Sequence, residues 1–322
     1  MNVLLMYSTH APSAEHITRL ESRHGGVRVS VADSEADARA QAQTADVIFG
    51  HRYLRQCLPQ ARRLRWVQST AGGVDRLPLD ALAKQGVMLT RMTVSAPVIA
   101  RHAVTLAWAV TRRLPEAVAR QREGQWDASF DWPPQPQRAA VFGMGAVGKA
   151  VAQCLHADGI TVYGVRRRSQ ETMPAPFARV YDRTSWRDVL PHVDWCILAL
   201  PHTAGTRGQF DREALSRLPA HAVLVNVGRG ETVITSDLVQ VLEQGHLSGA
   251  ALDVISPSPT GPDDPVWHTP RLLLTPYVAA HSRERPAALE RFCEAQLARY
   301  RAGTPLQNQV LLPSRTPNAE AP

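Results

Sequence analysis

From residue 1 to residue 90 the chain alternates between short apolar runs and longer amphipathic stretches. Short apolar runs bounded by polar residues are typical of buried strands, and the stretches between them, such as 14–23, have the spacing of helices. Strands that alternate with helices predict a parallel α/β sheet. The strands predicted in this part of the chain are 3–7, 27–31, 47–49 and 64–68.

A long helical pattern then covers 98–124, and Pro115 predicts a break in it because proline lacks a backbone N–H. The proline-rich segment 131–136 predicts a rigid connection, after which the alternation of strand and helix resumes. The segment from Pro305 onward is polar and proline-containing, so we expect it to fray. The later predicted strands are 138–142, 160–165, 194–200, 222–227, 249–254 and 271–274, and the later predicted helices are 149–157, 211–217, 236–244 and 284–301.

These patterns predict an α/β protein with two doubly wound parallel-sheet domains, Rossmann-like or flavodoxin-like, and ligands bound in the cleft between them. A chain of 322 residues is long enough for two cores. We expect an outer substrate domain over 1–97 plus 283–322. We expect a dinucleotide-binding domain with a helical arm over 98–282.

Three glycines spaced as GxGxxG follow the predicted strand 138–142, and they are Gly143, Gly145 and Gly148. In a dinucleotide-binding unit such glycines allow the tight turn, the approach of a pyrophosphate and the packing of helix on strand. Backbone N–H groups at the start of the next helix, those of Ala146 and Val147 among them, can bind phosphate. The strand 160–165 follows at the distance that such a unit requires.

The end of that second strand carries three arginines, Arg166, Arg167 and Arg168. An NAD-binding unit places an acidic residue there, about 20 residues after the glycines, to bind the ribose 2′-hydroxyl. Guanidinium groups instead bind a 2′-phosphate well. The sequence therefore predicts NADP(H) as the preferred cofactor, with NAD(H) possible; the alternative is a solvated surface run in an arginine-rich protein.

Composition narrows the class of protein. Hydrophobic residues make up 44% of the chain and charged residues 20%, and no apolar run is long enough for a membrane span. The net charge is +7, but the arginines are spread along the chain without a nucleic-acid-binding motif, so no nucleic-acid partner is expected. The four cysteines are scattered and no metal site is predicted. Without a signal-peptide pattern at the N-terminus, we expect a cytoplasmic location.

Four segments resemble the D-isomer-specific 2-hydroxyacid dehydrogenase family, which includes glyoxylate/hydroxypyruvate reductases. They are Trp-Val-Gln-Ser-Thr-Ala-Gly-Gly-Val-Asp at 66–75, Leu-Pro-His-Thr-Ala-Gly-Thr-Arg-Gly at 200–208, Leu-Val-Asn-Val-Gly-Arg-Gly at 224–230 and Gly-Ala-Ala-Leu-Asp-Val at 249–254. The resemblance covers nearly the whole chain. It implies hydride transfer between a nicotinamide and the C2 atom of a 2-keto or 2-hydroxy acid. It also implies a homodimer that pairs through the arm at 98–124.

The resemblance implies a role for several residues. Arg229 would polarise the substrate carbonyl, because a fixed cation stabilises the charge that develops on its oxygen; the alternative is a surface arginine on a tight turn. The backbone N–H groups of Ala71, Gly72 and Gly73 would bind the substrate carboxylate, and Asp253 would contact the nicotinamide carboxamide. Further cofactor contacts would come from Leu200, Pro201, Thr206, Val227 and Gly228.

The chain departs from the family at the catalytic acid and base. The family carries a glutamate five residues after the aspartate and a histidine in a Thr-Pro-His sequence, and the two work as a proton donor and acceptor. Here these positions hold Ser258 and Tyr277, and a further family glutamate at the start of the arm is replaced by Arg101. Neither half of the family pair is present.

Four interpretations of this departure remain open. Tyr277 can donate the proton, since a phenol is protonated at neutral pH. His281, four residues downstream, can replace the imidazole, or it is only an exposed loop histidine. The chain can also have lost keto-acid chemistry and kept dinucleotide binding, or it acts on another hydride donor.

Other residues remain candidates for the substrate site or the interface. His51, Arg52 and Tyr53 follow the predicted strand 47–49, and Tyr53 is taken as a substrate residue. His102, inside the arm helix, is expected to pack or to lie at an interface. The sequence as a whole predicts NADPH-dependent reduction of a small anionic 2-keto acid to its D-2-hydroxy acid, and it leaves the identity of the acid and the physiological direction open.

Overall fold

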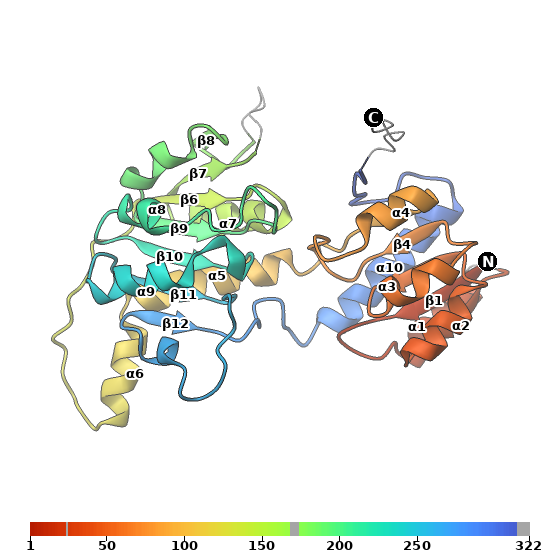
Figure 1. The fold of residues 1–322 in the computed structure, drawn as a ribbon, viewed down its shortest axis with the longest axis horizontal. Helices are drawn as coiled ribbons and strands as arrows, with labels where there is room; N and C mark the ends of the chain where they lie inside the picture. The colour runs from red at the N-terminus through yellow and green to blue at the C-terminus, as the bar shows by residue number, and fades with distance from the viewer. Residues whose placement is uncertain (24, 168–173, 314–322) are drawn as a thin grey trace, which may run out of the picture. The chain divides into compact units, whose positions relative to one another are not determined.

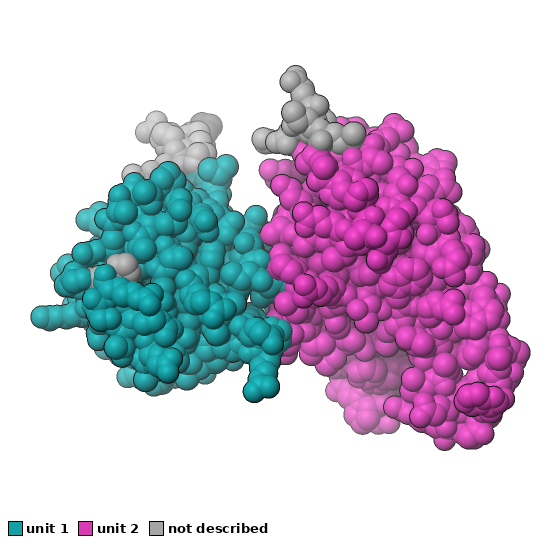
Figure 2. Space-filling view, turned by 180° about the vertical axis from the view of Figure 1, so that it is seen from behind, with its two compact units in different colours: residues 1–95, 282–322 teal, residues 96–281 magenta. Residues whose placement is uncertain are grey.

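The computed structural model describes residues 1–23, 25–167 and 174–313. The chain divides into two compact units, one of residues Met1–Ser95 with Ser282–Pro322 and one of residues Ala96–His281 (Figures 1 and 2). Each unit contains one parallel sheet between helices, so the α/β class predicted for both halves is confirmed. Among the described residues, no helix combines the length and the apolar character that a membrane crossing would need.

The first unit has a five-stranded parallel sheet in the order β2-β1-β3-β4-β5. Successive residues of β1 face opposite sides, as in any strand. Val3 and Leu5 pack with α1 and α10, whereas Leu4 and Met6 pack with α2, α3 and α4. The strands are β1 (Asn2–Met6), β2 (Arg28–Val31), β3 (Val47–Gly50), β4 (Trp66–Gln68) and β5 (Met88–Thr90), and the helices are α1 (Ala14–Ser22), α2 (Glu35–Ala42), α3 (Leu54–Cys57), α4 (Leu79–Gln85) and α10 (Arg285–Arg301).

The second unit has a seven-stranded parallel sheet in the order β12-β11-β10-β9-β6-β7-β8. The chain starts in the middle at β6, runs outward to β8 and then returns to β9 on the other side, which is the doubly wound order of dinucleotide-binding domains. The strands are β6 (Arg138–Phe142), β7 (Thr161–Val165), β8 (Arg179–Tyr181), β9 (Trp195–Leu198), β10 (Val223–Asn226), β11 (Gly249–Leu252) and β12 (Leu272–Leu274), and the helices are α5 (Ala96–Thr111), α6 (Leu114–Arg122), α7 (Ala146–Ala157), α8 (Arg212–Ser216) and α9 (Thr235–Glu243).

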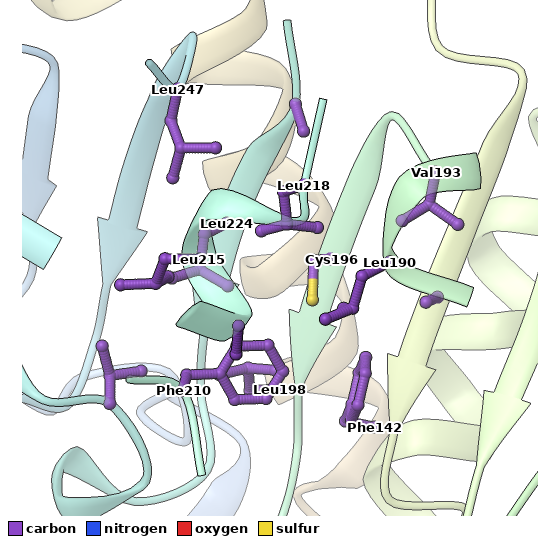
Figure 3. Close-up of a cluster of buried hydrophobic side chains, with 14 of the residues drawn as sticks. Phe142, Leu190, Val193, Cys196, Leu198, Phe210, Leu215, Leu218, Leu224 and Leu247 are labelled. Atoms are coloured by element: carbon purple, nitrogen blue, oxygen red, sulfur yellow. The ribbon is translucent and has the colours of Figure 1, made fainter. Parts of the chain in front are cut away.

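Both faces of this sheet are buried. Phe142, Leu198 and Leu224 point to one face and pack with α8 and α9 in the cluster that Figure 3 shows. Val141 and Ile197, their neighbours in the strands, point to the other face and pack with α5 and α7. Strands buried on both faces explain why the sequence shows continuous apolar runs here rather than an alternating pattern.

The structure differs from two expectations drawn from the sequence. The break in the long helical stretch is confirmed, but it falls at Arg113, whose left-handed backbone (φ 52°) ends α5, and Pro115 lies in the first turn of α6. Fraying from Pro305 onward is wrong for the described residues to 313. The Val310 N–H donates to Leu89 O of β5 at 2.8 Å, and the Val310 side chain packs on the core, so this segment is bonded to the sheet.

The C-terminal helix α10 is joined to α1 through buried charges. Glu294 lies 2.8 Å from His16 Nδ1 and accepts a hydrogen bond from Arg19 Nε at 2.9 Å. One turn away, Glu290 accepts hydrogen bonds from the backbone N–H and the hydroxyl of Ser13, both at 2.8 Å. Burial would raise the pKa of Glu294, but the hydrogen bonds from His16 and Arg19 outweigh it and hold the pKa below its ordinary value.

The first prediction concerns Glu294→Gln. Because its pKa is lowered in the folded state, Glu294 stabilises the fold above its ordinary pKa of 4.5, and this stabilisation is lost as the pH falls through the folded-state pKa. The substitution should lower the free energy of unfolding at pH 7 by about 2 kcal/mol, as measured by denaturant unfolding. The loss should shrink as the pH is lowered from 7 to below the ordinary pKa of 4.5. The exposed Glu243→Gln is the control, and an equal loss for Glu294→Gln at both ends of this range would contradict the assignment.

Candidate functional site

The candidate site of the second unit lies where the parallel strands β6, β9, β10, β11 and β12 end. Ligands of doubly wound sheets bind beyond the carboxyl ends of the strands, at the point where the strand order reverses. That point lies between β6 and β9 here. The residues predicted to bind the cofactor follow these strand ends directly.

The glycines of the turn after β6 have two different roles: two of them allow close backbone packing, and one leaves open space. Gly143 has φ +98°, and a Cβ there would lie 2.6 Å from Ala199 O, while a Cβ at Gly148 would lie 1.8 Å from Gly143 O. Both are therefore required by the fold itself. A Cβ at Gly145 would meet no atom within 4 Å, so glycine at this position leaves room that the fold does not use.

The helix that follows can receive an anion. α7 begins at Ala146, and its N-cap residue Gly145 has no side chain to accept from the first-turn N–H groups. Such N–H groups, at the positive end of the helix dipole, bind phosphates readily. The room at Gly145 and the uncapped N–H groups of Ala146 and Val147 fit a dinucleotide pyrophosphate.

The arginines after β7 lie at the same edge of the sheet. The Arg166 N–H donates to Tyr181 O of β8 at 3.0 Å, which fixes the backbone of Arg166 beside the strand end, and the residue is half-buried. Arg167 is exposed. Arg168, the third arginine of the predicted run, lies outside the described residues.

The loop after β9 carries Leu200, Pro201 and Thr206, which were predicted to contact the cofactor. The Thr206 hydroxyl donates to Pro201 O at 2.7 Å and accepts from the Thr203 N–H at 2.9 Å. The side chain of Thr206 therefore closes this loop upon itself. Leu200 meets the next loop, because a Cβ at Gly228 would lie 2.7 Å from Leu200 O.

Arg229 stands on a loop that its own neighbours hold rigid. Val227 follows β10, and then the Asn226 side chain accepts from the Gly228 N–H at 3.0 Å and donates to Arg229 O at 2.8 Å. A Cβ at Gly230 would lie 2.4 Å from the carbonyl carbon of Ile255, so this loop packs backbone to backbone on the loop after β11. Arg229 itself is half-buried and donates from Nη1 to Gly228 O at 2.8 Å.

Asp253, just after β11, organises the segment that follows β12. Its Oδ1 accepts from the Thr275 hydroxyl at 2.7 Å and from the Val278 N–H at 2.9 Å, and its Oδ2 accepts from the Ala279 N–H at 3.1 Å. The residue is only 3% exposed. A buried carboxylate needs such donors, and here they come from the loop that carries Tyr277.

The three positions predicted to replace the family acid and base lie in different settings. Tyr277 is 69% exposed and has a left-handed backbone (φ 58°), and its N–H donates to Asp253 O at 3.0 Å. His281 is exposed, and its N–H donates to Val278 O at 2.8 Å. Ser258 is exposed in the loop after β11. Asp253 thus holds the Tyr277 backbone directly, and a bulky residue with positive φ is uncommon outside constrained sites.

Sequence reasoning missed one residue of this site. His102 was expected to pack or to lie at an interface, but its Nε2 lies 3.2 Å from Thr275 Oγ1 and 3.5 Å from Asp253 Oδ1. His102 and Thr275 are 173 positions apart, so no local pattern could reveal the contact. Only the packing of α5 on β10 and β11 brings them together.

In the first unit, the residues predicted to bind the substrate carboxylate follow β4. The Ala71 N–H donates to Ser69 Oγ at 3.1 Å, and Ala71 O accepts from the Met92 N–H at 3.1 Å. Gly72 also lies close to Met92, which follows β5, since a Cβ at Gly72 would lie 3.1 Å from Met92 O. Gly73, next in the chain, is half-buried.

His51, rather than Tyr53, touches this segment. The Tyr53 hydroxyl donates to Asp33 O at 3.0 Å and its ring packs on the core. His51 Nδ1 lies 3.3 Å from the hydroxyl oxygens of both Ser69 and Thr70. Burial, with a smaller contribution from the charge of Arg285, lowers the pKa of His51.

Comparison with known proteins agrees with this geometry. A model of the NAD-binding domain of the D-isomer specific 2-hydroxyacid dehydrogenase family matches residues 104–279, and the chain belongs to that family of oxidoreductases. It is 31% identical over 252 residues to glyoxylate/hydroxypyruvate reductase B of Pectobacterium atrosepticum, covering 75% of this chain and 78% of the relative.

Two solved structures resemble the fold throughout. A D-isomer specific 2-hydroxyacid dehydrogenase of Xanthobacter autotrophicus, in complex with NADPH and MES, has a TM-score of 0.82 at 25% identity. An NADPH-dependent glyoxylate/hydroxypyruvate reductase of Sinorhizobium meliloti, in complex with NADP and sulfate, has a TM-score of 0.79 at 25% identity. Each comparison covers 96% of this chain and 98% of the other.

The glycine turn gives the second prediction, which compares Gly145→Ala with Gly148→Ala. A methyl group at Gly145 meets no protein atom but enters the room left for a pyrophosphate. We expect an unchanged melting temperature and a dissociation constant for NADPH that rises about 10- to 100-fold, which corresponds to roughly 1.4–2.8 kcal/mol. Gly148→Ala should instead lower the melting temperature, because its Cβ clashes with Gly143 O. Tight NADPH binding by Gly145→Ala would rule out this location of the phosphates.

Proposed function

We propose that this protein reduces a small 2-keto acid, of the glyoxylate or hydroxypyruvate type or larger, to the D-2-hydroxy acid with NADPH. The observation that carries the proposal is the edge of the second sheet, where a glycine turn with unused room follows β6 and the fixed loop of Arg229 follows β10, with only β9 between the two strands. The names of the Pectobacterium and Sinorhizobium relatives support the same reaction. The second unit would bind the cofactor and the first unit the substrate carboxylate.

Arg229 would stabilise the charge that develops during reduction. When bound, NADPH supplies the hydride that adds to C2 of the keto acid, and the carbonyl oxygen becomes negative. A fixed guanidinium beside that oxygen lowers the barrier without reorganising during the step. The Asn226 side chain and the close contact at Gly230 keep the Arg229 backbone in place. The N–H groups of Gly72 and Gly73 would hold the substrate carboxylate, whereas the N–H of Ala71 already donates to Ser69 Oγ.

Tyr277 would deliver the proton that the new alkoxide takes up. Its phenol is large and exposed, and Asp253 fixes its backbone by accepting from the neighbouring N–H groups of Val278 and Ala279. His281 is the second candidate and Ser258 an accessory one. After proton transfer, the phenolate would be re-protonated from water because the side chain is exposed.

A homodimer is proposed on the exposed apolar side chains of the arm. Leu114 and Val118 on α6 are 53% and 46% exposed, and Trp126 and Trp132 in the segment that follows are 104% and 48% exposed. Exposed apolar groups gathered on one segment mark interaction surfaces. A second copy of this chain, with the same self-complementary arm, would cover them.

The third prediction tests the cofactor preference. Arg166→Ala and Arg167→Ala should each raise the dissociation constant for NADPH by about 10-fold or more, since a charge-assisted hydrogen bond to phosphate contributes about 1.5–3 kcal/mol. The constant for NADH should change little, because NADH lacks the 2′-phosphate. Fluorescence titration with both cofactors measures the two constants. Equal weakening of both, or of neither, would contradict NADP selectivity through these arginines.

The fourth prediction tests the reaction and its proton donor. Wild type should oxidise NADPH when a 2-keto acid is added, Tyr277→Phe should reduce kcat about 100-fold, in the range of general-acid contributions, and His281→Ala should change it little. Absorbance of NADPH follows the reaction. Loss of kcat only in His281→Ala would move the role to His281. NADPH binding without turnover of any keto acid would favour a diverged dinucleotide-binding protein, or one that uses another hydride donor or acceptor.

A further inference from the structure

His102 forms a hydrogen-bonded cluster with Thr275 and Asp253 at the carboxyl ends of β11 and β12. Its Nε2 lies 3.2 Å from Thr275 Oγ1 and 3.5 Å from Asp253 Oδ1. The side chain of His102 is 24% exposed and that of Asp253 is 2% exposed, so the cluster is largely withdrawn from water. Each member comes from a different element: the first half of α5, the end of β11 and the end of β12.

The hydrogen bonds define which ring nitrogen carries the proton. Thr275 donates its single hydroxyl proton to Asp253 Oδ1 at 2.7 Å, since an ionised carboxylate only accepts. With its proton used in this way, Thr275 Oγ1 can only accept a hydrogen bond from His102 Nε2, which lies 3.2 Å away. Nε2 must therefore carry hydrogen. The geometry selects the Nε2–H form of the imidazole over the Nδ1–H form.

This cluster differs in place from the other histidine–carboxylate pairs of the described residues. His221 Nε2 lies 2.8 Å from Asp194 Oδ1, but Asp194 precedes β9 and so lies at the amino edge of the sheet. His16 and Glu294 join two helices of the first unit. His10 Nε2 lies 3.9 Å from Glu290 Oε1, also in the first unit. Of the two such pairs described in the second unit, only that of His102 and Asp253 lies at the edge where ligands of a doubly wound sheet bind.

We infer that His102 is a positioning residue of the proposed reductase, acting through Thr275 and Asp253 on the segment that carries Tyr277. The Nε2–H fixes the Thr275 hydroxyl, whose proton fixes Asp253 Oδ1. Asp253 in turn holds the N–H groups of Val278 and Ala279, which flank Tyr277 on its C-terminal side.

This chain of contacts holds Tyr277 in a strained backbone conformation. A left-handed backbone is strained at a tyrosine, so the surrounding hydrogen bonds must hold it there. If the cluster loosens, Tyr277 relaxes to an ordinary conformation and its phenol moves away from the reacting oxygen. An imidazole is therefore retained at this edge, in a position and a role that differ from those of the missing family histidine. The catalytic part of this inference rests on the proposed function.

The test compares His102→Leu, which removes the donor, with His102→Gln, whose amide nitrogen can replace Nε2–H. We expect His102→Leu to lower kcat about 10- to 100-fold, as misplacement of a reacting group does, with the NADPH dissociation constant and KM changed less than about 3-fold. His102→Gln should restore most of kcat. Thr275→Val should match His102→Leu, and the double variant should be no worse than either alone, because all three break one cluster.

His221→Leu is the matched control, since it removes the other histidine–carboxylate pair of the same unit. It should lower the melting temperature and leave kcat within about 2-fold, because ligands of doubly wound sheets bind at the opposite, carboxyl edge. A loss of kcat in His221→Leu as large as that in His102→Leu would mean that destabilisation alone explains both. An unchanged kcat in His102→Leu, or equal losses in His102→Leu and His102→Gln, would overturn the inference.

Two measurements need no enzymatic activity and so separate this inference from the proposed function. Nitrogen-15 NMR of the imidazoles, with His102 assigned from the His102→Gln spectrum, should show hydrogen on Nε2 of His102. Hydrogen exchange of the Val278 and Ala279 amides should be faster in His102→Leu than in wild type and His102→Gln. An Nδ1–H form, or unchanged exchange, would refute the positioning role even if keto acids are reduced. If wild type reduces no keto acid but both readouts hold, only the proposed function fails.

Discussion

Asp253 places an ionisable carboxyl group at 3% exposure, and a carboxylate so far from water must find donors within the protein. The donors it finds are the Thr275 hydroxyl and the N–H groups of Val278 and Ala279. Satisfying this carboxylate therefore sets the path of the chain after β12, including the left-handed backbone of Tyr277. His102 on α5 completes the cluster, so that the arm helix and the two last strands are tied at one point.

Close backbone contacts build the rest of the same edge. The turns after β6 and β9 touch at Gly143, the loops after β9 and β10 touch at Gly228, and the loops after β10 and β11 touch at Gly230. At each contact any side chain larger than hydrogen would force the loops apart. This locks the loop of Arg229 between its neighbours, and a fixed cation is what stabilisation of a developing oxyanion requires. Within the glycine turn after β6, Gly145 has open space instead of such a contact, and this space fits a ligand.

The sequence predicted the parts that depend on local pattern. Strand β6 (Arg138–Phe142) was predicted residue for residue, because an apolar run followed by glycines is a strong signal. The three-residue strands β5 (Met88–Thr90) and β8 (Arg179–Tyr181) were missed, whereas the equally short β4 and β12 lie within predicted strands. Tertiary contacts decided the remainder: the tail at Val310 bonds to β5, and His102 meets Thr275 only because α5 packs on the sheet. The roles of Arg229, Tyr277 and His281 stay predictions.

The central claim is that this edge transfers a hydride to C2 of a 2-keto acid. The most direct measurement uses NADPH deuterated at nicotinamide C4, on the face that the protein transfers, with glyoxylate or a larger keto acid, and analyses the product by mass spectrometry and chiral chromatography. We predict a 2-hydroxy acid with one deuterium on C2. For keto acids larger than glyoxylate, whose product has a stereocentre at C2 even without deuterium, we predict the D configuration. Two results would contradict the account. One is consumption of NADPH, deuterated on either face of nicotinamide C4, without deuterium in the acid, and the other is an L product.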